Sequence, residues 1–111
     1  MCRALRVLCA APDRARLDLL KRASVSAHWE LVGGATSVGE LEVQTAEWRP
    51  DVVVMEAALG GGAVRAVRAT RPAARIVSVG PLAGADAQAG SLDGIRQAVM
   101  GVPRPGGPVT A

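Results

Sequence analysis

The sequence predicts an α/β fold with a parallel sheet, and three observations support this prediction. Short apolar stretches typical of buried strands alternate with stretches of helical periodicity. Proline or glycine separates most of these stretches from one another. The length of 111 residues suits one compact domain and excludes separate cofactor and substrate lobes. Strands that alternate with helices run parallel, because each helix crosses a face of the sheet between them.

The composition sets the kind of core and excludes several functions. Half of the residues are hydrophobic, but Trp29 and Trp48 are the only Phe, Tyr or Trp residues, so aliphatic side chains must fill the core. The lack of aromatic side chains disfavours binding of single-stranded nucleic acid by base stacking. The net charge of +3 is modest. Two cysteines, Cys2 and Cys9, provide neither a disulfide framework nor a four-cysteine zinc site.

The first elements are a strand, a helix and a second strand. Leu5–Ala10 is a short apolar run, which indicates a buried strand. Asp13 can cap the helix that follows, with Leu17 and Leu20 turned toward the core. His28–Val32 alternates imperfectly and predicts a strand at the edge of the sheet.

A capping box marks the start of the second helix. Ser37 and Glu40 are spaced so that each side chain can bind the other residue's free backbone amide. The helix ends before Pro50. Its core-facing residues recur at helical spacing: Val38, Leu41, Thr45 and Trp48.

The central strand and the next pair of elements follow. Asp51–Met55 is rich in β-branched residues and predicts a strand covered on both faces. Gly60–Gly62 is expected to be a flexible turn before a helix at Ala63–Thr70. Arg75–Val79 predicts the fourth strand. In the third helix, valines are expected to face inward and arginines outward: Val64, Val67, Arg65 and Arg68.

The sequence pattern weakens after Pro81. Residues 82–90 are expected to form a loop, and no fifth strand is visible, so the sheet has four or five strands. Ser91 can cap a last helix that carries Leu92, Ile95 and Val99. Residues 103–111 have the composition of a flexible tail, which places the domain at residues 1–102.

The start of the chain does not fit a secretory leader. The uninterrupted apolar run Val7–Ala11 is too short for one, and no other stretch approaches the length of a membrane span. A soluble, cytoplasmic protein without membrane partners is therefore expected.

In a parallel sheet, reactive groups gather beyond the carboxyl ends of the strands. At that edge, residues 49–60, with the sequence RPDVVVMEAALG, resemble the third strand and following loop of the receiver domain of bacterial response regulators. The resemblance covers roughly residues 4–80 and, weakly, 91–101. It implies a flavodoxin-like, three-layer fold. It also places Glu56 where the family carries the aspartate that accepts a phosphoryl group.

The resemblance assigns three further positions, and none of them carries the family's residue. The acidic pair that holds Mg²⁺ in the family falls on Cys9 and Ala10, with Asp13 the first carboxylate beyond them. The Ser or Thr that follows the fourth strand falls on Gly80, and the only lysine, Lys21, lies in the first helix. Phosphoryl transfer depends on these charges. We therefore expect no metal, no cofactor and no enzymatic activity.

Glu56 allows two interpretations. It can be a permanent negative charge in place of a switchable one, in a degenerate receiver that signals without phosphorylation. Alternatively, it caps the following turn or meets a surface arginine.

The expected function is a phosphorylation-independent regulatory module that binds another protein of a two-component or transcription-regulatory pathway. In the family, the fourth helix, fifth strand and fifth helix commonly mediate docking. The candidate interface here is Ser91, Leu92, Ile95 and Val99, with any exposed edge of the fourth strand. A homodimer is expected if that edge is uncovered.

Two other functions stay open from the sequence. One is a flavodoxin-like module that binds a small molecule around Pro12, Asp13, Glu56 and the glycine turn. The other is the receiver part of a DNA-binding response regulator, which would contact nucleic acid only through a further domain.

Three other features have ordinary interpretations. His28 is expected at the surface and Cys9 in the core as a small apolar residue. The arginines 65, 68, 71 and 75 are expected to form a solvated basic strip, with an acidic partner or nucleic acid as the second interpretation.

Overall fold

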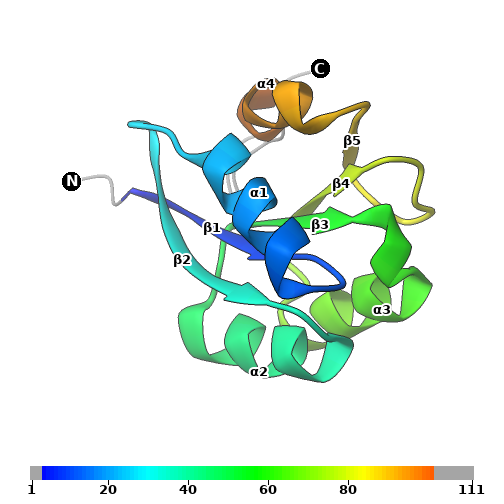
Figure 1. Cartoon of the computed structure of the whole chain (residues 1–111). Helices are drawn as coiled ribbons and strands as arrows, with labels where there is room; N and C mark the ends of the chain where they lie inside the picture. Colours follow the sequence, from blue (N-terminus) through cyan, green and yellow to red (C-terminus); the bar gives the residue numbers. More distant parts are fainter. Residues whose placement is uncertain (1–3, 102–111) are drawn as a thin grey trace, which may run out of the picture.

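A computed structural model describes residues 4–101 as one parallel sheet between two layers of helices. The strand order is β2-β1-β3-β4-β5, and every neighbouring pair is parallel. Helices α1 and α4 cover one face of the sheet, and α2 and α3 cover the other (Figure 1). The strands are β1 (Leu5–Ala10), β2 (Trp29–Ala35), β3 (Val52–Glu56), β4 (Arg75–Val79) and β5 (Ala87–Ala89). The helices are α1 (Arg14–Ser24), α2 (Val38–Trp48), α3 (Gly61–Thr70) and α4 (Ile95–Gly101), with short 3-10 helices at Ala57–Leu59 and Leu92–Gly94.

Strand β3 lies at the centre of the sheet, as predicted. Its side chains alternate between two hydrophobic clusters, because successive residues of a strand point to opposite faces. Val52 and Val54 belong to the cluster under α1 and α4. Val53 and Met55 belong to the cluster under α2 and α3. All four side chains are buried, which accounts for the continuous apolar run in the sequence.

Helix α1 follows the prediction closely. The Asp13 carboxylate accepts a hydrogen bond of 2.8 Å from the backbone amide of Arg16 and so caps the first turn. Leu17 and Leu20 are buried against the sheet. At the far end, the indole of Trp29 donates a hydrogen bond of 2.7 Å to the carbonyl of Ser24, which fixes α1 to the start of β2.

Strand β2 is the edge strand, as predicted, but it is longer than expected. It continues through Gly33 and Gly34 to Ala35, because the side chain of Gln44 supports this glycine pair from α2. The amide group of Gln44 accepts a hydrogen bond of 3.0 Å from the Gly34 nitrogen and donates one of 2.7 Å to the Gly34 carbonyl. These bonds satisfy backbone groups on the free side of the strand.

The capping box of α2 forms only in part. The Ser37 hydroxyl accepts from the backbone amide of Glu40 at 3.1 Å, as predicted. The Glu40 carboxylate instead accepts from the backbone amide of Thr36 at 2.7 Å. The prediction that Trp48 faces the core is wrong, since 38% of the residue is exposed. The indole nitrogen of Trp48 lies beside Gly33 of the edge strand.

The glycine triplet is not a free turn. Gly61 and Gly62 form the first turn of α3, and only Gly60 has a positive φ, of 80°. Gly60 thus makes the bend between the 3-10 helix and α3. Val64 and Val67 face the core, as predicted.

A fifth strand completes the sheet, in agreement with the expected four or five strands, and it replaces part of the loop that was expected at residues 82–90. Ala87–Ala89 pairs with β4 along Val77–Val79. The strand is short, and its alanines and glutamine carry no strand preference, so no pattern indicated it. Residues 80–86 connect β4 to β5 without a helix, and Leu82 and Ala85 pack against the core on the α2 and α3 face.

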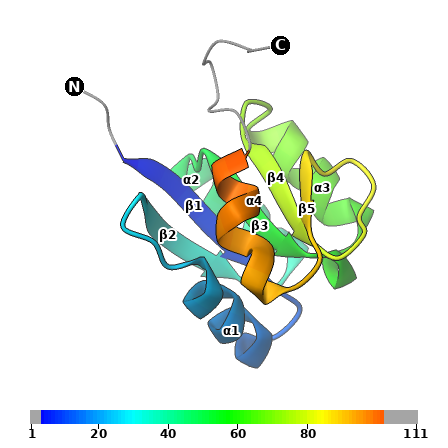
Figure 2. The same ribbon diagram turned by 90° about the horizontal axis from the view of Figure 1, so that it is seen from above.

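The last helix begins differently from the prediction. Residues 92–94 form a 3-10 turn, and Ser91 makes no side-chain capping bond. Helix α4 then runs across the same face as α1, as the view from above shows (Figure 2). The expected tail at residues 103–111 lies outside the described residues. Within residues 4–101, no helix is long and apolar enough to cross a membrane.

Candidate functional site

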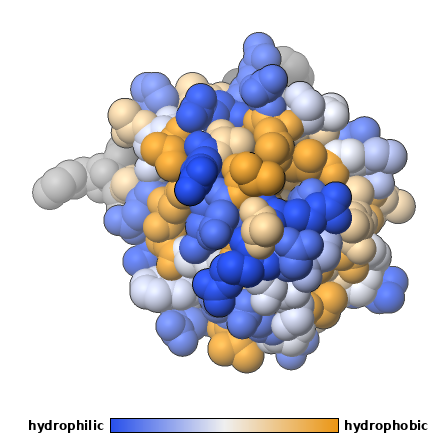
Figure 3. All heavy atoms as spheres, in the orientation of Figure 1, coloured by the Kyte–Doolittle hydropathy of each residue, from blue (hydrophilic) through white to orange (hydrophobic). Residues whose placement is uncertain are grey.

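A pocket of about 310 Å³ opens where the carboxyl ends of β3 and β4 meet α1 and the start of the last helical segment. Its location agrees with the rule that ligands gather at this edge of a parallel sheet. Six residues line it: Arg16, Leu19, Glu56, Val79, Ser91 and Leu92. In Figure 3, hydrophobic surface lies between α1 and α4 with hydrophilic side chains beside it.

Glu56 is the last residue of β3 and one of the two charged residues that line this pocket, with Arg16 as the other. Its side chain is 16% exposed, and its Oε2 atom lies 3.5 Å from the Nε atom of Arg16. Oε2 is buried and has no hydrogen-bond donor within the described residues. The carboxylate makes no capping bond to the 3-10 helix that follows. Of the sequence-based interpretations, a contact with a surface arginine is therefore confirmed.

The structure does not bring the predicted acidic positions together. Cys9 and Ala10 are fully buried in β1, where they pack on opposite faces of the sheet. The carboxylate of Asp13 caps α1 and does not line the pocket. Lys21 extends along Gly34 of β2 and is likewise absent from the lining. Glu56 is thus the pocket's sole carboxylate.

Burial also controls the chemistry of Cys9. Loss of solvent raises the pKa of its thiol from 9.0 to about 11, although hydrogen bonding with Ser24 and the charge of Lys21 act in the opposite direction. A thiol with this pKa is protonated at neutral pH and is a poor nucleophile. The interpretation of Cys9 as a small core residue is consistent with this environment.

Gly80 follows β4 in a conformation that glycine favours, with φ of 92°. A Cβ atom at this position would lie 3.3 Å from the Cβ of Ala57. The nearest hydroxyl in sequence belongs to Ser78, which is buried and donates a hydrogen bond of 2.8 Å to the Gly80 carbonyl. This hydroxyl therefore supports the turn after β4.

The candidate interface needs correction at two positions. Ile95 and Val99 are buried in the core beneath α4, because this face of the helix covers β4 and β5. Ser91 and Leu92 line the pocket. The outer face of α4 instead presents Arg96, Gln97 and Met100. The edge of β4 is also covered, because β5 pairs with it, so the condition for a dimer through that edge is not met.

The predicted basic strip is also wrong for three of its four arginines. Arg68 pairs with Asp86 at 2.9 Å. Arg75 also lies near Asp86, at 3.9 Å. Arg71 donates a hydrogen bond of 2.8 Å to the carbonyl of Pro50. These three side chains are half-buried and contact neighbouring loops, and of the four arginines only Arg65 is exposed.

Sequence reasoning named three of the six lining residues, Glu56 as a site residue and Ser91 and Leu92 as part of an interface. It missed the roles of Arg16, Leu19 and Val79. Arg16 and Leu19 lie on the outer face of α1. The helical periodicity of the sequence identifies this face as solvent-exposed, but it does not predict that the face lies next to the end of β3. Among residues 4–101, no three His, Cys, Asp or Glu side chains are grouped so that they could hold a metal ion.

Comparison with known proteins finds similarity at the level of structure. No protein-family model and no curated protein sequence matches the chain. The response regulator domain of Thermotoga maritima CheB superposes with a TM-score of 0.67 at 21% identity, covering 91% of this chain and 100% of that one. A LuxR-family two-component response regulator from an Aurantimonas species gives 0.62 at 24% identity, covering 78% and 73%. The chain therefore has the flavodoxin-like fold of response-regulator receiver domains.

Proposed function

We propose that this chain is a receiver-like module of a bacterial two-component or transcription-regulatory pathway, and that it acts in the cytoplasm by binding another protein without being phosphorylated. The observation that carries the proposal is the state of Glu56. Its carboxylate occupies the end of the central strand and pairs with Arg16 at 3.5 Å. A glutamate at this position supplies a carboxylate without any phosphoryl group, and we propose that it replaces the switchable charge of the family.

The surroundings of Glu56 support the same proposal. Phosphoryl transfer to a carboxylate requires cations that neutralise the incoming charge and hold it in line. The positions at the end of β1 that would supply metal ligands carry buried Cys9 and Ala10. The longer side chain of glutamate also moves the carboxylate outward from the strand by one methylene group.

The proposed contact surface is the outer face of α4. Arg96, Gln97 and Met100 are exposed there, and 61% of Met100 is accessible to solvent. Methionine and arginine are both enriched in protein interfaces, and this face of α4 carries one of each. The partner is proposed to contact this face, since the core-facing residues Ile95 and Val99 are inaccessible.

Incubation with acetyl phosphate and Mg²⁺, followed by intact-mass and peptide mass spectrometry, tests the absence of phosphorylation. We expect no phosphoryl adduct, and a receiver domain with a complete acidic site serves as the positive control. A specific adduct on Glu56 or Asp13 would overturn the proposal.

A second experiment tests whether partner binding is independent of phosphorylation. It uses a partner protein identified by affinity capture. The dissociation constant of the purified complex should be the same with and without acetyl phosphate and Mg²⁺. A change of about tenfold or more on phosphorylating treatment would contradict a constitutive mode of binding.

A further inference from the structure

The pocket beside Glu56 has the chemistry of a binding site for a small zwitterion. We propose that it binds a free α-amino acid with an aliphatic side chain. The inference uses the same Glu56 and Arg16 side chains as the function proposed above, but it does not need that function to hold, because that function concerns phosphorylation and the surface of α4.

The first argument is the incomplete pairing of Glu56. Its Oε2 atom is buried without a hydrogen-bond donor, and the contact of 3.5 Å with the Arg16 Nε atom is longer than a normal charged hydrogen bond. Buried acceptors in proteins almost always have donors. The Arg16 side chain is 53% exposed, so its guanidinium group can rotate away from Glu56 at little cost. An ammonium group in the pocket would then supply the donor that Glu56 lacks.

The second argument is that two neighbouring groups of opposite charge, Glu56 and Arg16, both line the pocket. A ligand that is only an anion is repelled by Glu56, and a ligand that is only a cation is repelled by Arg16. An α-amino acid carries its ammonium and carboxylate groups on one carbon atom. Its ammonium group can therefore bind Glu56 while its carboxylate binds Arg16. Arginine binds a carboxylate with two parallel hydrogen bonds.

The third argument is the apolar wall. Leu19, Val79 and Leu92 line the pocket together with the Ser91 hydroxyl group, and no aromatic side chain is present in the lining. Aliphatic walls favour an aliphatic ligand side chain over a polar one. The volume of about 310 Å³ is at the lower end of the range for ligand pockets, which suits one amino acid and is small for a nucleotide.

Binding is tested on the full chain by calorimetric titration with L-leucine, L-isoleucine and L-valine. We expect saturable binding of at least one of them at neutral pH. Two analogues of leucine separate the two charges: 4-methylpentanoate lacks the ammonium group, and 3-methylbutylamine lacks the carboxylate. Each analogue should bind at least about tenfold more weakly than leucine.

Matched variants locate the site. Glu56→Gln and Arg16→Gln should each weaken binding by about tenfold or more, because each removes one charge of the pair. Glu47→Gln and Arg14→Gln change the same residue types at exposed positions outside the lining and should leave the affinity unchanged. Thermal unfolding of every variant shows whether it is folded.

Amide chemical shifts of the wild-type protein give a readout that needs no variant. Leucine should shift the amide signals of Arg16, Val79 and Leu92 in a saturable manner. The inference is wrong if none of the three amino acids binds, if 4-methylpentanoate binds as tightly as leucine, or if the shifted signals lie elsewhere. None of these results would affect the acetyl phosphate test, so the two proposals can fail separately.

Discussion

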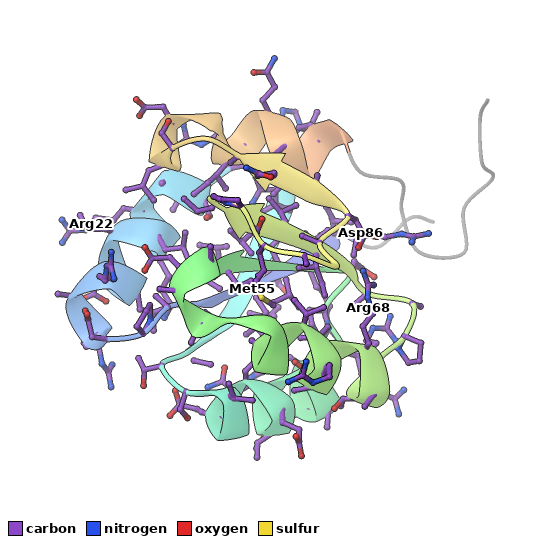
Figure 4. All side chains as sticks on the ribbon, turned by 90° about the vertical axis from the view of Figure 1, so that its right-hand side faces the viewer. Arg22, Met55, Arg68 and Asp86 are labelled. Atoms are coloured by element: carbon purple, nitrogen blue, oxygen red, sulfur yellow. The ribbon has the colours of Figure 1, made fainter. Side chains whose placement is uncertain are left out.

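The Asp86 carboxylate lies 2.9 Å from an Nη atom of Arg68 and joins α3 to the connection between β4 and β5. The two side chains point toward one another in Figure 4. The same carboxylate oxygen accepts a hydrogen bond of 2.7 Å from the Ile76 amide at the start of β4. Arg68 also donates to the carbonyls of Ala74 and Gly84, at 3.0 Å each. This network holds residues 80–86 against α3 and the start of β4.

Replacement of Asp86 should therefore destabilise the fold. Asp86→Asn keeps the shape but removes the charge that pairs with Arg68, and it weakens the bond to the Ile76 amide. We expect a loss of about 1–3 kcal/mol in the free energy of unfolding, as for other hydrogen bonds to charged groups. Urea denaturation measures this loss. Asp18→Asn on the exposed face of α1 is the control, and an equal effect of both changes would contradict the proposed role.

The two sides of α4 should respond differently to truncation. Ile95 is fully buried, so Ile95→Ala leaves a cavity and should cost about 2–5 kcal/mol of stability. Met100→Ala on the outer face should change stability by less than about 0.5 kcal/mol.

The Met100→Ala variant also tests whether the outer face of α4 is the contact surface for the partner. In the captured complex, Met100→Ala should weaken partner binding by about tenfold or more while the chain stays folded. Unchanged affinity of this variant would place the contact elsewhere.

Gln44→Ala should affect both stability and association. The variant loses both hydrogen bonds to Gly34 and leaves the free side of β2 unsatisfied. We expect a loss of about 1–3 kcal/mol in urea denaturation and a mass in light scattering that rises with protein concentration. Gln97→Ala on α4 is the matched control. A Gln44 variant that stays as stable and as monodisperse as this control would disprove the edge-protecting role.

Cys9 should make the stability of the protein depend on alkaline pH. The pKa of its thiol is about 11 in the folded state and 9.0 without burial, so the folded state keeps a proton that the unfolded state releases. The associated stability is complete below pH 9 and is lost as the pH rises from 9 to 11.

Two variants are compared by their free energy of unfolding: Cys2→Ser, which keeps Cys9, and the double variant Cys2→Ser with Cys9→Ala. Urea denaturation at pH 8, 9, 10 and 11 should show a steeper fall above pH 9 for the chain with Cys9. Parallel curves for the two chains would mean that the thiol is not shifted.

Patterns within a single element predicted most of the fold. Runs of β-branched residues predicted β3 and β4, and Asp13 predicted the start of α1. In each case the residues that form the sequence pattern are the same residues that stabilise the element. Strand β5 could not be found in this way. The residue before it, Asp86, bonds to Ile76 of β4 and to Arg68 of α3, and such contacts between distant parts of the chain leave no pattern in the sequence.

The site was predictable to a smaller extent. Glu56 was identified because it ends a strong strand and matches a known arrangement. Arg16 was missed, since its distance from Glu56 depends on how α1 crosses the sheet. The prediction that Ile95 and Val99 belong to an exposed interface was wrong. Helical spacing places these two residues on the same face of α4, but it does not say whether that face meets the core or the solvent.

The end of α2 shows where this protein could be made more stable. Arg49 closes the helix with φ of 48° and ψ of 59°, a left-handed conformation that costs a residue with a side chain about 1 kcal/mol. Glycine adopts this conformation without strain, so Arg49→Gly is a route to higher thermal stability at an exposed position outside the pocket. Unused gains of this kind are common in proteins, because selection keeps stability above the threshold that function needs and does not maximise it.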